Sequence, residues 1–317
     1  MSYSIGVDLG GTKMLIVLVD DQGKVVQEKR VQTRPERGPM AIIQEMIQEV
    51  LVLLDSCGVT AHKLKGIGVC IAGFYDGLSD IMRSSPNLPG WEMFPVKDMI
   101  LQLIDCLVVV ENDASAAAYG EHLYGAGKNV NHLAHITLGT GIGCGLILDG
   151  HLYRGSRGFA GELGHIQLLP NGPVCGCGRR GCFEALASGT AIAREGRRLL
   201  ETSRKTMLQQ LVPKGDAVSA SHVFKAAELH DAEAKHIIKE AAFYLGSGLS
   251  VVTNLLNPER ITLGGGLSRV GDTFIEEAKE HFYASAVDVS SETVELVRAE
   301  LTDKAGALGM IALLNEQ

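Results

Sequence analysis

The stretch SIGVDLGGTKMLIVLVD, residues 4–20, contains two apolar, β-branched runs joined by a Gly-Gly-Thr turn. Runs of this kind are typical of strands, so we predict strands at 4–9 and 13–20. A third strand at 24–32 follows the Asp-Asp-Gln-Gly turn. A P-loop would need G-x-x-x-x-G-K-[ST] at the start of a helix. Here Thr12 precedes Lys13 and a strand follows, so the turn is of another type.

This first glycine turn carries groups that bind phosphate. Glycines let backbone N–H groups approach phosphate oxygens closely, and a threonine hydroxyl adds a further donor. The strand-end aspartate could hold Mg²⁺ through water, because Mg²⁺ keeps much of its hydration shell. The candidate residues are Asp8, Gly10, Gly11, Thr12 and Lys13. An ordinary tight hairpin is the alternative for the same residues.

The same order of elements recurs in HLAHITLGTGIGCGLILDGHLYRG, residues 132–155. It predicts strand, Gly-Thr-Gly turn, strand, Asp-Gly turn and a further strand, with Gly139, Thr140 and Gly141 as the second candidate turn. It is not a dinucleotide fingerprint, because a strand rather than a helix follows. A weak internal repeat suggests two related halves. Two such turns facing across a cleft would grip a polyphosphate from both sides, although this turn could also be only a tight hairpin.

The rest of the chain alternates between predicted helices and strands, which indicates an α/β protein. Its 317 residues suffice for about two domains. Asp303 is the expected N-cap of the last helix. We predict helices at about 39–56, 114–125, 232–255 and 303–317, and strands in 64–73, 107–113 and 261–266.

Short polar side chains gather near the ends of predicted strands and in loops. Asp113, at a strand-to-helix corner, could accept a proton from a substrate hydroxyl during phosphoryl transfer. A plain N-cap is the alternative for this residue. Groups of this kind also suit the hydroxyls of a sugar, and the candidates are Asn87, Asn112, Asp113, Glu162 and Glu184.

The segment GELGHIQLLPNGPVCGCGRRGCFE, residues 161–184, contains three closely spaced cysteines and a histidine. Three thiolates and an imidazole form a complete tetrahedral zinc set, here His165, Cys175, Cys177 and Cys182. We expect a structural rather than a catalytic zinc, because no coordination position stays open. Coincidental thiols or a redox pair is the alternative.

Composition excludes several classes of protein. Hydrophobic residues make up 46% and charged residues 21%, which is ordinary for a globular chain. The formal net charge of −8 argues against a nucleic-acid or anionic-membrane surface. No signal peptide or membrane span is evident, and the odd number of cysteines, seven, fits a cytoplasmic protein.

Taken together, these motifs resemble the ROK (repressor, open reading frame, kinase) sugar kinases, most closely the bacterial ATP-dependent glucokinases. The resemblance covers essentially the whole chain. The motifs that carry it are DLGGTK at 8–13, SSPNLPGW at 84–91, END at 111–113, LGTGIGCG at 138–145, GELGH at 161–165, CGCGRRGCFE at 175–184 and LGGGLS at 263–268. Ala72 departs from the pattern, since the family often has proline there.

The resemblance implies an actin-like ATPase (ribonuclease H-like) fold and roles for individual residues. Asp113 would be the catalytic base for the sugar 6-hydroxyl. His165 would bind zinc through one ring nitrogen and the sugar through the other. The implied sugar ligands are Asn87, Asn112, Glu162, His165 and Glu184. The implied ATP contacts are the two glycine turns together with Gly264, Gly265 and Gly266.

The resemblance also sets expectations for domains, substrate and partners. It implies a small α/β domain at 1–118 with the helix at 303–317, and a large domain at 119–302. We expect ATP, Mg²⁺ and structural zinc, with glucose as substrate and N-acetylglucosamine or N-acetylmannosamine as alternatives. A homodimer or homotetramer is expected. The family includes repressors with an added N-terminal winged helix, but only seven residues precede Asp8, so DNA binding is not expected.

Overall fold

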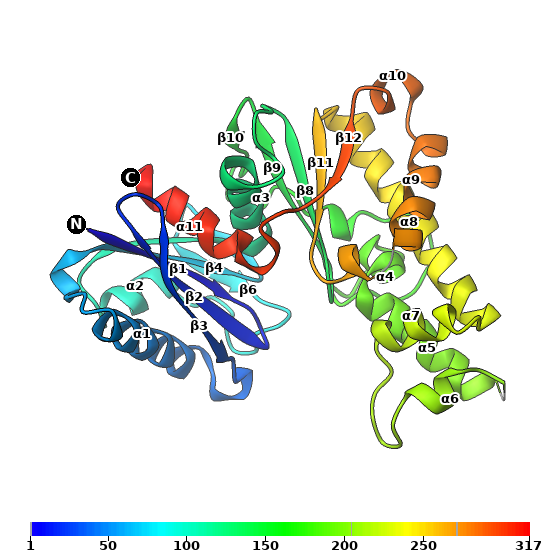
Figure 1. The fold of residues 1–317 in the computed structure, drawn as a ribbon, viewed down its shortest axis with the longest axis horizontal. Coiled ribbons are helices and arrows are strands. Elements are labelled where there is room, and N and C mark those ends of the chain that lie inside the picture. The colour runs from blue at the N-terminus through cyan, green and yellow to red at the C-terminus, as the bar shows by residue number, and fades with distance from the viewer. Residues whose placement is uncertain (1, 204, 271) are drawn as a thin grey trace. The chain divides into compact units, whose positions relative to one another are not determined.

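The computed structural model describes residues 2–203, 205–270 and 272–317 as two compact α/β units (Figure 1). Unit 1 comprises residues 1–135, 145–161 and 299–317, and unit 2 comprises 136–144 and 162–298. The boundary expected after residue 118 falls inside helix α3 (Asp113–Tyr124). The domain division implied by the family resemblance therefore stays a prediction.

Unit 1 is built on a five-stranded sheet of order β3-β2-β1-β4-β7, in which β4 pairs in parallel with both β1 and β7. The strands predicted around the first glycine turn are confirmed within one residue. The sheet strands are β1 (Tyr3–Leu9), β2 (Lys13–Asp20), β3 (Val25–Gln32), β4 (Leu64–Ile71) and β7 (Leu107–Asn112). The other elements of the unit are α1 (Pro39–Ser56), α2 (Val96–Leu101), α3, α11 (Ala305–Asn315), the short strands β5 (Phe74–Asp76), β6 (Ile81–Ser84) and β10 (His151–Leu152), and the 3₁₀ turns η1 (Pro35–Arg37), η2 (Ala61–Lys63) and η5 (Thr302–Lys304).

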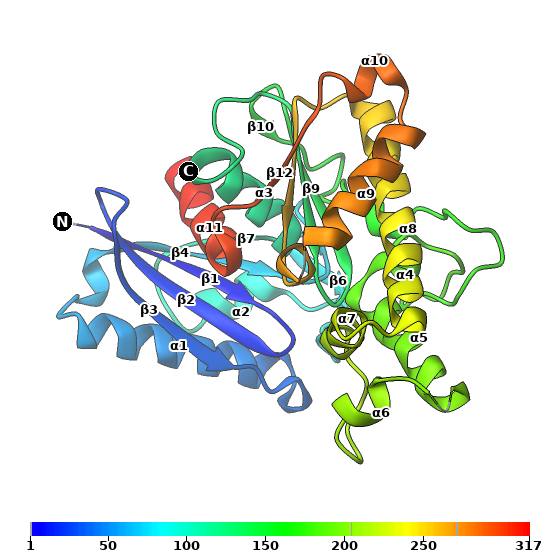
Figure 2. The same ribbon diagram turned by 45° about the vertical axis from the view of Figure 1, so that its right-hand side comes forward.

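A second sheet has the order β10-β9-β8-β11-β12. The chain passes between the units along β8 (Leu133–Leu138) and β9 (Ile142–Leu148). The Gly-Thr-Gly turn therefore joins two strands, as predicted. Unit 2 further contains β11 (Arg260–Gly264), β12 (Glu295–Arg298), α4 (Glu184–Ala187), α5 (Gly189–Thr202), α6 (Leu208–Leu211), α7 (Ala220–Glu228), α8 (Ala232–Leu256), α9 (Asp272–Ser285), α10 (Asp288–Ser291), η3 (Leu163–His165) and η4 (Leu267–Arg269). Within unit 2, α9 packs along the long helix α8 (Figure 2).

The first sheet is covered on both faces, and strand β2 shows why. All but its two end residues are buried, as expected for a strand with helices on either side. Met14, Ile16 and Leu18 join the core that contains α1. The alternate residues Leu15, Val17 and Val19 pack with α11. Because side chains alternate along a strand, one apolar run supplies two cores.

Glycines allow α11 to lie unusually close to its neighbours. A Cβ added at Gly6 in β1 would collide with the carbonyl of Ala307 in α11. A Cβ at Gly309 would collide with the carbonyl of Ala116 in α3. Backbone therefore packs directly on backbone, and the start of α11 is held against the end of β1.

The start of α11 differs from the sequence expectation. We expected Asp303 to cap a helix beginning at 303, but the helix begins at Ala305, and Lys304 at its N-cap makes no side-chain capping bond. Asp303 lies in the preceding 3₁₀ turn, where its Oδ2 accepts from Arg30 at 3.1 Å. A long-range ion pair has replaced the local cap, and this pairing was not visible in the sequence.

Among the residues that the structure describes, no helix is both long enough and apolar enough to cross a membrane.

Because α11 packs so closely, we predict that replacing a glycine in this helix by alanine destabilises the protein, whereas the same change normally stabilises a helix. In the interior of a helix, alanine is normally more favourable than glycine by about 1 kcal/mol. At Gly309 the added methyl would strike α3, so we expect Gly309→Ala to lower the free energy of unfolding by about 1–3 kcal/mol. Urea unfolding followed by circular dichroism measures this. The control is Gly77→Ala, where an added Cβ meets nothing within 4 Å. A Gly309→Ala variant as stable as the parent would contradict the packing.

Candidate functional site

The first glycine turn joins β1 to β2 and is closed by the Gly10 amide donating to the Lys13 carbonyl at 3.1 Å. A Cβ at Gly11 would lie 2.6 Å from the Asn87 carbonyl oxygen, so only glycine fits beside that loop. Thr12 and Lys13 are exposed. The packing thus brings the turn and the loop that carries Asn87 together, although 75 residues of sequence separate Gly11 from Asn87.

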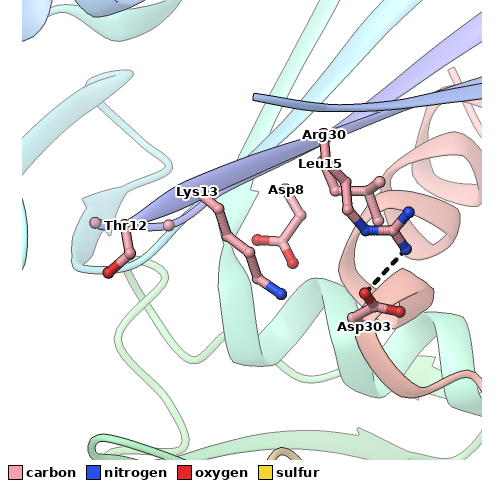
Figure 3. A pocket seen from close by; sticks show the side chains of 8 residues that line it. Asp8, Thr12, Lys13, Leu15, Arg30 and Asp303 are labelled. Carbon is pink, nitrogen blue, oxygen red and sulfur yellow. Dashed lines mark hydrogen bonds and ion pairs between the residues drawn. The ribbon is translucent and has the colours of Figure 1, made fainter. Parts of the chain in front are cut away.

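A cavity of about 220 Å³ lies beside this turn, entirely within unit 1. Figure 3 shows the side chains of Asp8, Lys13 and Arg30 directed toward a common space, with Arg30 paired to Asp303. The lining residues are Asp8, Gly10, Gly11, Thr12, Lys13, Leu15, Arg30 and Asp303. All five residues expected at this turn line the cavity. Arg30 was not among the residues predicted from the sequence, because its place depends on strand register: it lies opposite Leu15 across β2 and β3.

Asp8 is set in an environment that favours its neutral form. The pKa of its carboxyl is raised from 3.8 to about 7, mainly by burial and in part by the negative charge of Asp113. A hydrogen bond with the Cys70 thiol and the charge of Lys13 lower this pKa by less. A Cβ at Gly306, in the first turn of α11, would be 3.3 Å from the Asp8 carboxyl carbon. The carboxyl group therefore packs closely against the start of α11 on one side, and on the other it faces the cavity that Lys13 also lines.

Asn112 and Asp113 lie where β7 turns into α3, as the sequence predicts. The Asn112 side chain is the N-cap, accepting from the Ser115 amide at 3.0 Å. Its Nδ2 donates to the Gly73 carbonyl at 3.1 Å and to Asp113 Oδ1 at 3.0 Å. Asn112 rather than Asp113 therefore caps the helix.

Asp113 has a raised pKa for the same reason as Asp8. Burial is the main cause, and hydrogen bonds from the backbone amides of Ala114 and Asp113 and from Asn112 only partly offset it. A carboxyl group whose pKa is raised toward the working pH is suited to accepting a proton. Its orientation is fixed by Asn112 on one side and by the helix start on the other.

Asn87 is exposed in the SSPNLPGW loop. The loop is anchored by Trp91, which is fully buried and packs against Phe94 with ring centroids 5.4 Å apart. A hydrogen bond from the Ser85 hydroxyl to the Ala72 carbonyl, 2.6 Å long, holds its other end. The Asn87 side chain is therefore presented to solvent from a fixed loop.

The cysteine and histidine residues form one cluster in unit 2. The ligand atoms of His165, Cys175, Cys177 and Cys182 all lie within 4.8 Å of one another. His165 Nδ1 is 3.7 Å from the Cys175 sulfur, and the sulfurs of Cys177 and Cys182 are also 3.7 Å apart. Zinc–sulfur bonds of about 2.3 Å at tetrahedral angles place neighbouring sulfurs about 3.8 Å apart. The cluster is thus compatible with a zinc site.

His165 and Glu162 lie together beside this cluster. His165 turns Nδ1 toward Cys175, and its other nitrogen, Nε2, is 3.8 Å from Glu162 Oε2. The Glu162 side chain is 41% exposed. One ring nitrogen thus faces the thiols and the other faces an accessible carboxylate.

Glu184 connects the cluster to the second glycine turn. Its Oε1 accepts from the Cys175 thiol at 3.5 Å, and its Oε2 accepts from the Ile142 amide at 3.0 Å. The turn is also held by the start of α5, where the Gly189 amide donates to the Gly139 carbonyl at 2.8 Å and Thr190 Oγ1 donates to the Thr140 carbonyl at 2.8 Å. The backbone of this turn is therefore fixed from two sides.

The remaining candidate glycines lie at the end of β11, where Gly264 is the last residue of the strand. Gly265 has a φ of +82°, and a Cβ there would collide with the Leu138 carbonyl. Gly266 faces open space. In total the structure brings the candidates together in two sets, one in each unit. Unit 1 holds the first glycine turn, Asn87, Asn112 and Asp113, whereas unit 2 holds the second turn, Glu162, His165, Glu184, the three cysteines and Gly264 to Gly266.

Comparison with known proteins gives consistent results. The ROK family model matches residues 4–317. A glucokinase of Halalkalibacterium halodurans is 34% identical over 316 residues, which cover 99% of this chain and 96% of that protein. A xylose repressor of Bacillus spizizenii is 31% identical over 316 residues, covering 99% of this chain and 77% of the repressor.

Among solved structures, a ROK family glucokinase from Streptomyces griseus, in complex with glucose and AMPPNP, matches with a TM-score of 0.85. The two chains are 32% identical, and the match covers each of them completely. The two-sheet α/β architecture is thus the ROK sugar kinase fold, of the actin-like ATPase class. With a family model and relatives that span nearly all of its length, the chain belongs to the ROK family.

Proposed function

We propose that this protein is an ATP-dependent hexose kinase that phosphorylates the 6-hydroxyl of glucose. The observation that carries the proposal is Asp113, a half-buried residue whose carboxyl group has a raised pKa and is oriented by Asn112 at the start of α3. Support also comes from relatives named glucokinase and from a related structure that holds glucose and AMPPNP.

In the proposed reaction, Asp113 orients the 6-hydroxyl and takes its proton as the new O–P bond forms and the bond between the β- and γ-phosphates breaks. The transition state of phosphoryl transfer is loose, so the base need only position the nucleophile and accept the proton late. The donors from Asn112 Nδ2 and from the backbone amides at the start of α3 would hold the Asp113 carboxylate in position for the substrate. The exposed hydroxyl of Thr12, the ammonium of Lys13 and the backbone amides of the turn would bind phosphate oxygens.

The second set would bind the rest of both substrates. Glu162, His165 and Glu184 in unit 2, with Asn87 and Asn112 in unit 1, would bind sugar hydroxyls. The nucleotide would be bound by Thr140 and by Gly264 to Gly266. The turn that carries Thr140 is fixed by Glu184 and by the start of α5. Glu162, as an accessible carboxylate beside His165, favours a sugar with free hydroxyls near C1 and C2. N-acetylglucosamine and N-acetylmannosamine are the alternative substrates.

Mg²⁺ would be held beside the phosphates, through water, by Asp8. The fit is chemical, because the half-buried Asp8 has a carboxyl group with a raised pKa that lines the cavity, with Lys13 as the cation beside it. A divalent cation would favour its ionised form. Mg²⁺, when bound, supplies neutralisation of phosphate charge.

Zinc would be held by His165, Cys175, Cys177 and Cys182, whose spacing fits a tetrahedral set. All four positions would be filled by protein, so zinc would act structurally. It would hold the glycine-rich segment that carries these cysteines and would fix the rings and carboxylates next to it.

A sugar-responsive regulator is the second candidate, because relatives named xylose repressor match nearly the whole chain. The two functions differ in turnover, so one assay separates them.

We expect ATP consumption with Mg²⁺ to be fastest, by kcat/KM, with glucose in a panel that includes N-acetylglucosamine, N-acetylmannosamine, mannose and fructose. The matched variant is Asp113→Asn, which keeps the shape but cannot accept the proton. It should lose at least about 10²–10⁴-fold in kcat while retaining its melting temperature. A preference for an acetamido sugar would change the substrate and keep the mechanism. No turnover with any sugar would favour the regulator, and a fully active Asp113→Asn would remove Asp113 as the base.

Loss of one thiolate should empty the metal site. We expect Cys177→Ser to contain less than one zinc per chain by mass spectrometry and to melt at a lower temperature, at roughly 2–4 °C for each kcal/mol lost. Cys57→Ser is the control, since Cys57 lies outside the cluster. Zinc-free protein from a careful purification, or an unchanged melting temperature for Cys177→Ser, would argue against a structural metal.

The raised pKa of Asp8 predicts a pH-dependent stability. Folded protein binds the proton more tightly than unfolded protein does, because the pKa is about 7 in one and 3.8 in the other. Relative to Asp8→Asn, the free energy of unfolding of the parent should therefore fall as pH rises from about 4 to 7, by at most about 1.4 kcal/mol per pH unit. Unfolding of both proteins at pH 5, 6, 7 and 8 without added Mg²⁺ measures this. A difference that does not change with pH would contradict it.

A further inference from the structure

Arg30 lines the cavity beside the first glycine turn, although it lies in β3, a strand that contains none of the predicted site residues. It lies in β3, directly opposite Leu15, which follows Lys13 by two positions on β2. Its guanidinium lines the cavity together with Asp8, Thr12 and Lys13 (Figure 3). Its neighbour Lys29 pairs with Glu49 of α1, on the opposite face of the sheet. Strand alternation thus directs Arg30, and not Lys29, to the cavity.

The guanidinium is held in place by two carboxylates. Its Nη1 donates to Glu28 Oε1 at 2.7 Å and its Nη2 donates to Asp303 Oδ2 at 3.1 Å. Glu28 in turn pairs with Lys304 at 2.7 Å. This chain of charges joins β3 to the turn before α11. The Arg30 side chain nonetheless stays 47% exposed, and two bonds use only part of the five N–H donors of a guanidinium.

The charges of the cavity suit a polyanion. Lys13 and Arg30 supply two positive charges. Burial favours the neutral form of Asp303, but hydrogen bonds from Arg30 and Thr302 and the charges of Arg30 and Lys13 outweigh it, so its pKa lies below the ordinary value. Asp303 is thus ionised and orients Arg30 through the bond from Nη2 to Oδ2. A phosphate chain would bind to a guanidinium that is already oriented, and the paired N–H donors of a guanidinium match the geometry of phosphate oxygens.

We propose that Arg30 binds the phosphate chain of the phosphoryl donor and that Asp303 is its positioning residue. The inference rests on the proposed kinase function and deepens it. At about 220 Å³ the cavity is smaller than the roughly 300–1,000 Å³ typical of ligand pockets. It therefore takes the end of the phosphate chain rather than the whole nucleotide.

The test compares Arg30→Met with Lys29→Met. The two changes are the same in charge and nearly so in size, on adjacent residues that face opposite sides of one strand. We expect Arg30→Met to raise the KM for ATP about ten- to a hundredfold, the loss typical of a hydrogen bond to a charged group, and to leave the KM for the sugar unchanged. Lys29→Met should leave both unchanged. Arg30→Lys should recover part of the affinity, because it restores the charge without the fork.

A binding measurement separates this inference from the proposed function. Calorimetric titration with inorganic tripolyphosphate should show binding to the parent and to Lys29→Met and weaker binding to Arg30→Met, whether or not any sugar is phosphorylated. Asp303→Asn should weaken tripolyphosphate binding less than Arg30→Met does. If the parent phosphorylates glucose and Arg30→Met matches Lys29→Met in KM and in binding, the inference fails and the kinase function stands. If no sugar is turned over but Arg30→Met alone loses tripolyphosphate binding, the kinase function fails and Arg30 remains a phosphate-binding residue. Equal loss of ATP and sugar affinity in Arg30→Met would indicate a general structural role and overturn the inference.

Discussion

The direct contact of the α11 backbone with β1 and α3 is the constraint on which the rest of unit 1 depends. Glycines at positions 6, 120 and 309 remove the side chains that would otherwise separate these elements. The contact fixes the start of α11 beside Asp8 and sets Asp303 within reach of Arg30. Because α3 also carries Asp113 at its first residue, the same packing relates the proposed proton acceptor to the first glycine turn. The geometry of the site thus follows from helix packing and not from the loops alone.

The parts of the fold with local signals could be predicted from the sequence. The strands around the Gly-Gly-Thr turn, α1 and the long helix α8 all follow their hydrophobic patterns to within about one residue. The cysteine cluster was predictable because closely spaced cysteines and a nearby histidine match the ligand set of a zinc site. Asp303 and Arg30 were not predictable, since their pairing joins positions 273 residues apart and depends on strand register and on where α11 begins. Capping rules describe a helix end in isolation, and here a long-range ion pair prevails.

Burial affects the two candidate carboxyl groups of unit 1, those of Asp8 and Asp113, in the same way, but the consequences differ. Both Asp8 and Asp113 have raised pKa values, mainly because burial penalises the ionised form. Asp113 is additionally held by donors from Asn112 and the start of α3, which fix its direction. Asp8 instead faces the cavity beside Lys13. A fixed acid suits proton transfer, whereas a largely neutral acid that lines a cavity suits a site that receives a cation with its ligand.

In unit 2 the backbone of the glycine-rich segments has to be fixed by contacts with other residues, because glycine is conformationally flexible. The second glycine turn is held by backbone amides from the start of α5 and by Glu184, whose other oxygen contacts Cys175. Candidate metal ligands, an acidic side chain and a candidate nucleotide turn are therefore connected through Glu184. A disturbance at the thiols would reach the turn through Glu184 before it reached the helices of the unit. On this argument, the cysteine cluster has a role beyond stabilising its own segment, since Glu184 links it to the Ile142 end of the second glycine turn.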